Sequence, residues 1–345
     1  DMVAKYAGAK YGVACMNGTV GLHIAQILLG ITEDDHVIAP NITFIATLNA
    51  IKYTGAQPIL IDVDINNWQM DLDLLEQYLE QHTEFKTTKS GTFCFDTTTN
   101  KRVRAIMPVH VLGNIGDMDR LLSISKKYHL DIIEDSTEAL GSLFKSKHAG
   151  TFGSIGVFSF NGNKIISTGG GGVIITDDQA LAIKARHLTT QAKISAMDYI
   201  HDEIGYNYRM VNVLAAIGVA QMETFNATLQ SKKDMDRFYR CHLKDIGDIK
   251  FQEIPQGTNH NGWLFTFKTS KMRQLLAYLN SNGVQARPFW MPMNQLKMFK
   301  NEIYVTNTDV SASVYNTSIS IPSSAGITQK QLQTVVETIK TFFKG

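Results

Sequence analysis

Cysteine is scarce in this chain of 345 residues, which contains only Cys15, Cys94 and Cys241. The three lie far apart, form no CxxC pair and are odd in number, so the sequence indicates neither a disulfide framework nor a zinc knuckle. This pattern is typical of a reducing compartment. We therefore expect a cytoplasmic protein and no metal site.

Long apolar runs and an excess of one charge are absent as well. No run approaches the roughly 20 apolar residues of a membrane helix, and the N-terminus has no basic-then-apolar signal. Lys and Arg total 33 against 32 Asp and Glu, which leaves no overall electrostatic footprint for nucleic acid. We expect neither a membrane nor a nucleic-acid partner, whereas a small anionic substrate is compatible with this balance.

Several nucleotide-binding and hydrolase motifs are also missing. Lys164, in "SFNGNKIISTGGGG", lies near glycines, but Ile165 follows it and position 158 is not glycine, so the GxxxxGK[ST] spacing fails. No GxGxxG opens a helix after the first strand, and neither HExxH nor GxSxG occurs. The nicotinamide, zinc-protease and esterase interpretations therefore lose their main support, and a turn lysine at the surface is the default alternative for Lys164.

The sequence does contain the pattern of a large α/β protein. With 44% hydrophobic residues it can bury a large core, and its length favours about two domains. Through about residue 160, β-rich runs such as "HVIAP", "PILIDVD" and "LDIIED" alternate with helical patterns, which predicts a mostly parallel sheet covered on both faces. A helical stretch from Asn212 to about His242 then leads into a smaller α+β region. We predict a large domain over 1–225 and a small one over 226–345.

Two further features give Lys164 a possible chemistry. A Schiff-base lysine needs a carboxylate that keeps a pyridine nitrogen protonated and a cradle for a phosphate. Asp135 follows a buried apolar run and would emerge at the carboxyl end of a strand, where α/β folds bind ligands. An acid before "STEALGS" is equally well explained as a helix cap.

The cradle would be "NGTVGLHIAQILLG", in which Thr19 opens an amphipathic helix that Gly30 stops. The amides of Gly18 and Thr19 at this helix N-terminus favour an anion, although Asn-Gly-Thr is also an ordinary helix start. Ser159 offers a further hydroxyl. The glycines at 169–172 are explained only in part by a hairpin turn, and four in succession suggest that a cofactor or partner chain passes close by.

Together, these segments closely resemble the DegT/DnrJ family of PLP-dependent nucleotide-sugar aminotransferases over nearly the whole chain. The matching segments include "NGTVGLHIA", "APNITFIATLNAIKYTGAQPILIDVD", "MPVHVLGNIGDMD", "IIEDSTEALGS", "GTFGSIGVFSFNGNKIISTGGGGVIIT", "RHLTTQ", "GYNYRMVNVLAAIGVAQME" and "ARPFW". The resemblance is strongest to the bacillosamine and legionaminic-acid branch, which makes UDP-4-amino-4,6-dideoxy-GlcNAc-type sugars. It implies the α/β PLP-dependent transferase fold type I, similar to aspartate aminotransferase. Relatives usually carry some tens of residues before "AKYAGAKYGVACMNGT", so we expect an N-terminal segment to be missing here.

The resemblance also implies roles for individual residues. Lys164 would form the internal aldimine with pyridoxal 5'-phosphate (PLP), and Asp135 would pair with the pyridine nitrogen. The phosphate would be held by Gly18, Thr19 and Ser159. Further cofactor contacts would come from Phe44, Glu138, Asn161 and, from the neighbouring subunit, Asn212. Active sites shared across a homodimer are therefore expected.

The implied reaction is ping-pong transfer of the amino group of L-glutamate, through PLP, to the 4-keto carbon of a nucleotide-linked 4-keto-6-deoxy sugar. Candidate substrate contacts are His110, His187, Tyr206, Arg209 and Arg287. Purely structural roles compete with these: a satisfied strand-end histidine at His110, interface packing at Tyr206 and an ion pair at Arg209.

Three alternatives stay open. The first is amination at C3 or of a GDP-linked sugar. The second, a dehydratase of the same fold, has histidine at the lysine position, which Lys164 argues against. The third is a non-catalytic scaffold relative, against which the presence of both Lys164 and Asp135 argues.

Overall fold

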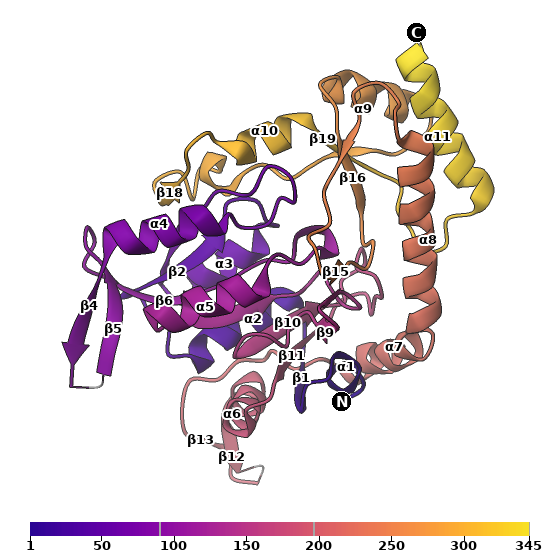
Figure 1. Cartoon of the computed structure of the whole chain (residues 1–345). Coiled ribbons are helices and arrows are strands. Elements are labelled where there is room, and N and C mark those ends of the chain that lie inside the picture. The colour runs from indigo at the N-terminus through magenta and orange to yellow at the C-terminus, as the bar shows by residue number, and fades with distance from the viewer. Residues whose placement is uncertain (90, 196, 345) are drawn as a thin grey trace.

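Two β-sheets organise the chain in the computed structural model, which describes residues 1–89, 91–195 and 197–344 (Figure 1). The large sheet has the order β1-β11-β10-β7-β6-β2-β3-β18, and the β4–β5 hairpin joins it through β6. Its strands are β1 Tyr11–Cys15, β2 Asp35–Pro40, β3 Gln57–Ile61, β4 Thr83–Thr88, β5 Gly91–Asp96, β6 Arg102–Ile106, β7 Asp131–Asp135, β10 Ile155–Ser159, β11 Gly172–Thr176 and β18 Ile303–Val305.

Most of the large sheet is parallel. From β10 through β7, β6, β2 and β3 to β18, each neighbouring pair runs in the same direction. Only β11, which lies between β1 and β10, and the β4–β5 hairpin introduce antiparallel pairs. The mostly parallel sheet predicted from the alternating pattern is confirmed.

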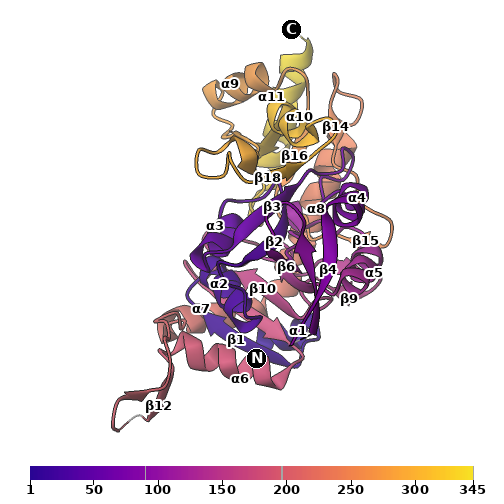
Figure 2. The ribbon, with the colours of Figure 1, turned by 90° about the vertical axis from the view of Figure 1, so that its left-hand side faces the viewer.

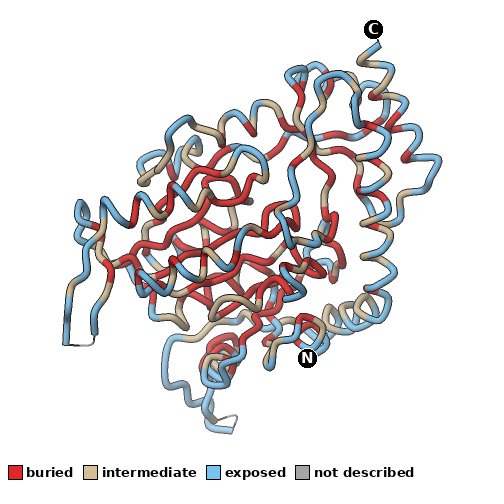
Figure 3. The backbone as a smooth tube through the Cα atoms, viewed as in Figure 1, coloured by how far each residue is buried: buried red, intermediate tan, exposed pale blue. Residues whose placement is uncertain are grey.

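Helices cover both faces of this sheet, as the continuous apolar runs of its strands require. Apolar residues of α2, α3 and α6 share one core with the sheet, and those of α4 and α5 share another. Every residue of β2 is buried, and Figure 3 shows buried backbone concentrated in the central strands.

The helices are α1 Met2–Ala7, α2 Gly18–Leu28, α3 Ala46–Tyr53, α4 Leu72–His82, α5 Met118–Tyr128, α6 Gln179–Thr189, α7 Asn212–Glu223, α8 Phe225–Leu243, α9 Met272–Ser281, α10 Val310–Thr317 and α11 Gln329–Lys344. None of the helices in the described ranges is long and apolar enough to cross a membrane.

The second sheet is small and antiparallel, and lies toward the C-terminus of the chain. Its order is β14-β16-β19-β17, with β14 Lys250–Phe251, β16 Phe265–Lys268, β17 Arg287–Pro288 and β19 Ser318–Ile321. Apolar residues of α8, α9 and α11 pack on it, among them Tyr239, Leu275 and Val336. The division at residue 226 stays a prediction, because β18 from the later segment pairs with β3 of the large sheet.

Two minor groups of strands complete the fold. β8 Leu143–Phe144, β9 Lys147–His148 and β15 Thr258–Asn259 form a small sheet. β12 Lys193–Ser195 and β13 Ile200–His201 form a hairpin arm that extends away from the rest of the chain (Figure 2).

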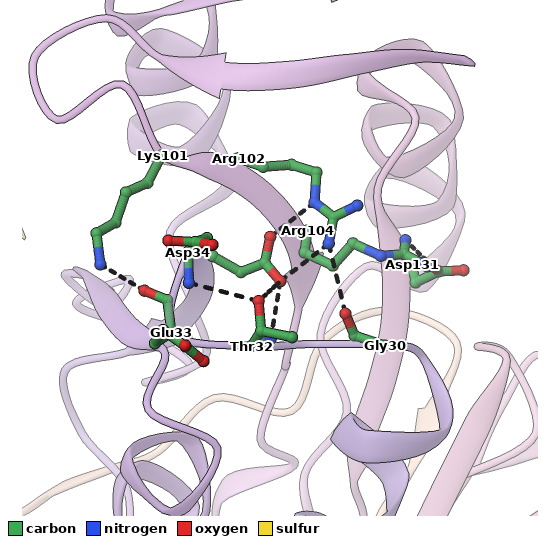
Figure 4. A network of polar contacts seen from close by, with 9 residues as sticks. Gly30, Thr32, Glu33, Asp34, Lys101, Arg102, Arg104 and Asp131 are labelled. Carbon is green, nitrogen blue, oxygen red and sulfur yellow. Dashed lines mark hydrogen bonds and ion pairs between the residues drawn. The ribbon is translucent and has the colours of Figure 1, made fainter. Parts of the chain in front are cut away.

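The amino ends of the parallel strands are fixed by ion pairs (Figure 4). Arg102, the first residue of β6, donates from Nε to Oδ1 of Asp35, which begins β2, over 2.6 Å. Arg104 of β6 pairs with Asp131, which begins β7. These contacts link neighbouring strands at their amino ends, at the opposite end of the strands from the carboxyl ends.

Candidate active site

A cavity of about 490 Å³ opens at the carboxyl ends of β2, β7 and β10. Helix α2 supplies part of its wall, and the small sheet supplies another part through β17 and β19. Carboxyl ends of parallel strands are where open α/β sheets bind ligands. Nine of the predicted site residues line the cavity: Gly18, Thr19, Phe44, Asp135, Glu138, Ser159, Asn161, Lys164 and Arg287.

Asp135 ends β7 and is almost fully buried. Its Oδ2 accepts a hydrogen bond from Thr47 Oγ1 (2.6 Å), and its Oδ1 accepts one from the amide of Thr137 (3.2 Å). The segment "STEALGS" forms turns and no helix, so the helix-cap interpretation of Asp135 is wrong. Within the described part of the chain, no cation pairs with this carboxylate. A buried unpaired carboxylate is costly, and it suits a ligand with a positive edge.

Lys164 lies in the loop between β10 and β11, where its amide donates to the carbonyl of Asn161 (3.0 Å). Its side chain is 10% exposed, and its Nζ lies 3.8 Å from Glu138 Oε1. Nζ also lies 4.4 Å from the centre of the Trp263 ring. The amine therefore lies in the wall of the cavity, close to both an acid and an aromatic ring.

Glu138 is the acid beside this lysine. Its Oε2 accepts a hydrogen bond from the amide of Leu112 (2.8 Å). Burial raises the pKa of Glu138 to about 7, although the positive charge of Lys164 and the Leu112 amide act in the opposite direction. Near neutral pH this carboxyl group is therefore present in both its protonated and its ionised form.

The raised pKa of Glu138 has a consequence for stability that the Glu138→Gln variant tests. A carboxyl group with pKa near 4.5 when unfolded and about 7 when folded binds more protons in the folded state between these values. Its stabilising effect is full below about pH 4.5 and is lost as the pH rises through about 7. Between pH 5 and 8, we expect the free energy of unfolding of the cofactor-free protein to fall by about 2–3 kcal/mol more in the wild type than in Glu138→Gln.

Urea unfolding at several pH values measures this difference. The exposed Glu80 on α4 provides the control, because Glu80→Gln should keep the pH dependence of the wild type. Equal slopes for the wild type and Glu138→Gln would contradict the raised pKa.

The N-terminus of α2 forms a second part of the cavity wall. Asn17 caps this helix by accepting a hydrogen bond from the amide of Val20 (3.0 Å). First-turn amides such as those of Gly18 and Thr19 have no acceptor within the helix, and they favour an anion. A Cβ at position 18 would lie 2.9 Å from Ser159 Cβ. Glycine is therefore needed where the helix start meets the end of β10.

The glycine run after Lys164 has more than one structural cause. Gly169 and Gly171 adopt positive φ of 81° and 151°, and Gly170 lines the cavity. At Gly172, an added Cβ would lie 2.7 Å from the carbonyl carbon of Asn17. The close approach at Gly172 is thus to the backbone of the same chain, and the approach of a cofactor or partner chain to this glycine run stays a prediction.

Two substrate candidates lie outside the cavity among other side chains. His110 is buried, and its Nε2 lies 2.9 Å from Glu134 Oε2. This is the satisfied strand-end histidine of the structural interpretation. The ring of Tyr206 stacks on that of Tyr208 with centroids 4.9 Å apart.

The other three candidates outside the cavity are more exposed. His187, at the end of α6, contacts Asp202 over 2.6 Å. Arg209 is exposed, and its backbone bridges to Cys15. Asn212 is the exposed first residue of α7. Whether these side chains reach the cavity of a neighbouring subunit stays a prediction.

The sequence interpretation missed several residues that line the cavity, among them Thr47, Trp263 and Trp290. Thr47 bonds Asp135, and Trp263 and Trp290 line the cavity beside Phe44. Thr43 and Thr47 share a hydrogen bond of 2.7 Å between their hydroxyls. Two buried threonines four residues apart at the start of a helix are a detectable signal, whereas the position of Trp263 depends on packing between distant segments.

The sequence of this chain is similar to those of known aminotransferases. A family model described as the DegT/DnrJ/EryC1/StrS aminotransferase family matches residues 1–340. The putative pyridoxal phosphate-dependent aminotransferase EpsN of Bacillus subtilis (strain 168) is 32% identical over 349 residues, which cover 99% of this chain and 86% of the relative. GDP-perosamine synthase of Escherichia coli O157:H7 is 35% identical over 337 residues, which cover 97% and 86% of the two chains.

Solved structures agree on the fold. A DegT DnrJ EryC1 StrS aminotransferase from Brucella abortus superimposes with a TM-score of 0.89 at 25% identity, covering 99% of this chain and 88% of the other. DesV of S. venezuelae gives 0.88 at 24% identity, with coverage of 99% and 87%. The predicted α/β fold of PLP-dependent transferases, fold type I, is confirmed.

Proposed function

The chain belongs to the DegT/DnrJ/EryC1/StrS aminotransferase family, and from this premise we propose that it transfers the amino group of L-glutamate to the 4-keto carbon of a nucleotide-linked 4-keto-6-deoxy sugar. It is a PLP-dependent nucleotide-sugar aminotransferase. The observation that carries the proposal is that Lys164, Asp135 and the N-terminus of α2 all line the same cavity.

The residues of the cavity fit PLP. Asp135 is a buried carboxylate whose partners are one hydroxyl and one amide, which suits the protonated nitrogen of a pyridine ring. The first-turn amides of Gly18 and Thr19 suit the phosphate. A volume of about 490 Å³ lies within the range of small-molecule sites.

We assign the chemical steps of the reaction to bound PLP and to three side chains of this protein, Asp135, Thr47 and Lys164. Bound PLP supplies an electron sink and a carbonyl group that takes up the amino group. The Asp135 carboxylate holds a proton on the ring nitrogen by its opposite charge, and Thr47 orients that carboxylate. Lys164 Nζ, lying in the cavity wall, would move the proton of Cα of glutamate to the carbonyl carbon of the cofactor in the first half of the reaction, and a proton from that carbon to C4 of the sugar in the second.

The two substrates would approach from the side of the small sheet. Arg287 of β17 lines the cavity together with Trp290. A guanidinium group matches the planar geometry of carboxylates and phosphates. We therefore assign Arg287 to a carboxylate of glutamate or to the diphosphate of the sugar nucleotide.

The identity of the sugar nucleotide has two candidates. The resemblance of the sequence to the bacillosamine and legionaminic-acid branch supports a UDP-linked acetamido sugar. The relatives named GDP-perosamine synthase, at 31–35% identity, support a GDP-linked sugar. A relative named as a UDP-N-acetyl-3-dehydro-α-D-glucosamine 3-aminotransferase, at 29% identity, keeps C3 amination as an outcome of the test.

A substrate panel tests the proposal. Protein loaded with PLP is incubated with glutamate and, in separate reactions, with a UDP-linked 4-keto-6-deoxy acetamido sugar, a GDP-linked 4-keto-6-deoxy hexose or a UDP-linked 3-keto sugar. Mass spectrometry should detect an aminated product and 2-oxoglutarate with one of the 4-keto sugars. Amination of the 3-keto sugar alone would contradict the proposed position.

We further propose that the enzyme is a homodimer with shared active sites. Helix α7 has no buried residue within the single chain, although it is rich in apolar side chains. Val211, Val213, Ile217 and Val219 of this region are each more than 40% exposed. An apolar patch of this kind marks an interaction site, and it would place Asn212 at the subunit contact.

The Val213→Asp variant tests the dimer. Val213 is 72% exposed, so the folded monomer should tolerate a charge there, whereas an apolar interface should not. We expect light scattering to show a monomer at micromolar concentration and turnover to fall at least about tenfold, because the site would lose its shared residues. Met298, 59% exposed on another part of the surface, gives the control Met298→Asp. A fully active Val213→Asp dimer would rule out this interface.

A further inference from the structure

The amine of Lys164 lies close to two groups of different chemistry. Glu138 Oε1 lies 3.8 Å from Nζ, and the centre of the Trp263 ring lies 4.4 Å from it. Asp135 and Arg287 are the other charged residues that line this cavity. The face of an indole ring attracts an ammonium group through its quadrupole. Unlike the carboxyl groups, the ring cannot accept the proton that the amine carries.

Trp263 is also attached to the loop of Lys164. It is almost fully buried, and its Nε1 donates to the carbonyl of Asn163 over 2.7 Å. Asn163 directly precedes Lys164 in the chain. The indole thus contacts both the side chain of Lys164 and the backbone next to it, although Trp263 follows Lys164 by about a hundred residues.

A buried asparagine links the backbones of the two residues whose side chains lie near the amine. Asn261 Oδ1 accepts a hydrogen bond from the amide of Trp263 (3.0 Å), and its Nδ2 donates to the carbonyl of Glu138 (2.7 Å). Asn261 is fully buried. A Cβ at position 113 would lie 1.9 Å from Asn261 Oδ1, so Gly113 is needed to make room for it.

We propose that Trp263 is a positioning residue of the transamination site, which holds the free amine of Lys164 at the cavity wall without competing for its proton. Asn261 ties the backbone of Trp263 to that of Glu138, the two residues whose side chains lie close to that amine. This inference rests on the proposed function, because it assigns the ring to a lysine that must detach and return in every cycle.

The experiment uses the cofactor-free protein and an amine-acylating reagent. Peptide mass spectrometry measures the acylation rate of Lys164 relative to the exposed Lys126 on α5 in the same sample. In Trp263→Leu we expect this ratio to rise about fivefold, because the amine loses the attraction and the cover of the ring. In Trp263→Phe, which keeps a ring but loses the bond to Asn163, the ratio should stay within about twofold of the wild type.

The comparison between the two variants separates positioning from simple space filling. An unchanged ratio in Trp263→Leu would overturn the proposal, and so would an equal rise in both variants. Trp263→Met fills more of the space and replaces the leucine variant if thermal melting shows that the latter is unfolded. The readout needs neither PLP nor turnover, so failure of the proposed function, shown by an active Lys164→Ala enzyme, is distinguishable from failure of this inference.

Discussion

Replacement of Lys164 by alanine is expected to lower kcat at least about 10⁴-fold, since it removes the residue that we propose as both the attachment point for the cofactor and the general base. The substitution shortens a side chain that is 10% exposed and lines an open cavity. The fold should therefore persist. Turnover is measured as 2-oxoglutarate released from glutamate in the presence of the accepted keto sugar.

A matched lysine variant shows whether the loss of any lysine charge lowers turnover. Lys126 on α5 is exposed and does not line the cavity, so Lys126→Ala should keep the activity of the wild type. A Lys164→Ala enzyme within tenfold of the wild type would remove Lys164 from its assigned role.

Replacement of Asp135 by asparagine is expected to lower kcat about 10³-fold and to weaken PLP binding. The amide can still accept a hydrogen bond from Thr47, but it lacks the charge that, in the proposed role of Asp135, keeps a proton on the ring nitrogen. Loss of that proton removes most of the capacity of the ring to withdraw electrons. Steady-state turnover and equilibrium titration with PLP measure the two effects separately.

The control for Asp135 lies on the same strand. Asp131 begins β7 and pairs with Arg104 at the opposite edge of the sheet. Asp131→Asn should change stability slightly and turnover little, because surface ion pairs contribute about 0–1 kcal/mol. If both variants lost activity equally, the effect would come from the strand and not from the acid in the cavity.

The fold was predictable where a local pattern decides it. β2 and β7 are continuous apolar runs, and α2 shows a helical apolar pattern, so the sequence predicts buried strands and a covering helix. The β4–β5 hairpin was not predicted, because threonine and charged residues dominate β4. β18 was not predicted either, since its three residues pair with β3 far back in the chain. The helical stretch after Asn212 consists of two helices with a break at Thr224.

The residues of the site could be predicted from the sequence where they lie at the carboxyl ends of predicted strands. Adjacent residues of a strand point to opposite faces, so Glu134 and Asp135 separate: the first meets His110, and the second meets the cavity. The sequence alone could not exclude a functional His110, because its partner Glu134 lies on another strand. Trp263 escaped prediction for a similar reason, since only tertiary packing brings it over Lys164.

Reduction of the PLP-loaded protein with borohydride, followed by peptide mapping, tests the central claim most directly. If Lys164 meets the cofactor's carbonyl group while Asp135 faces its ring nitrogen in the same cavity, the peptide map should show one reduced adduct, on the peptide that contains Lys164. An adduct on a different lysine, or no adduct in a folded and PLP-saturated protein, would contradict it.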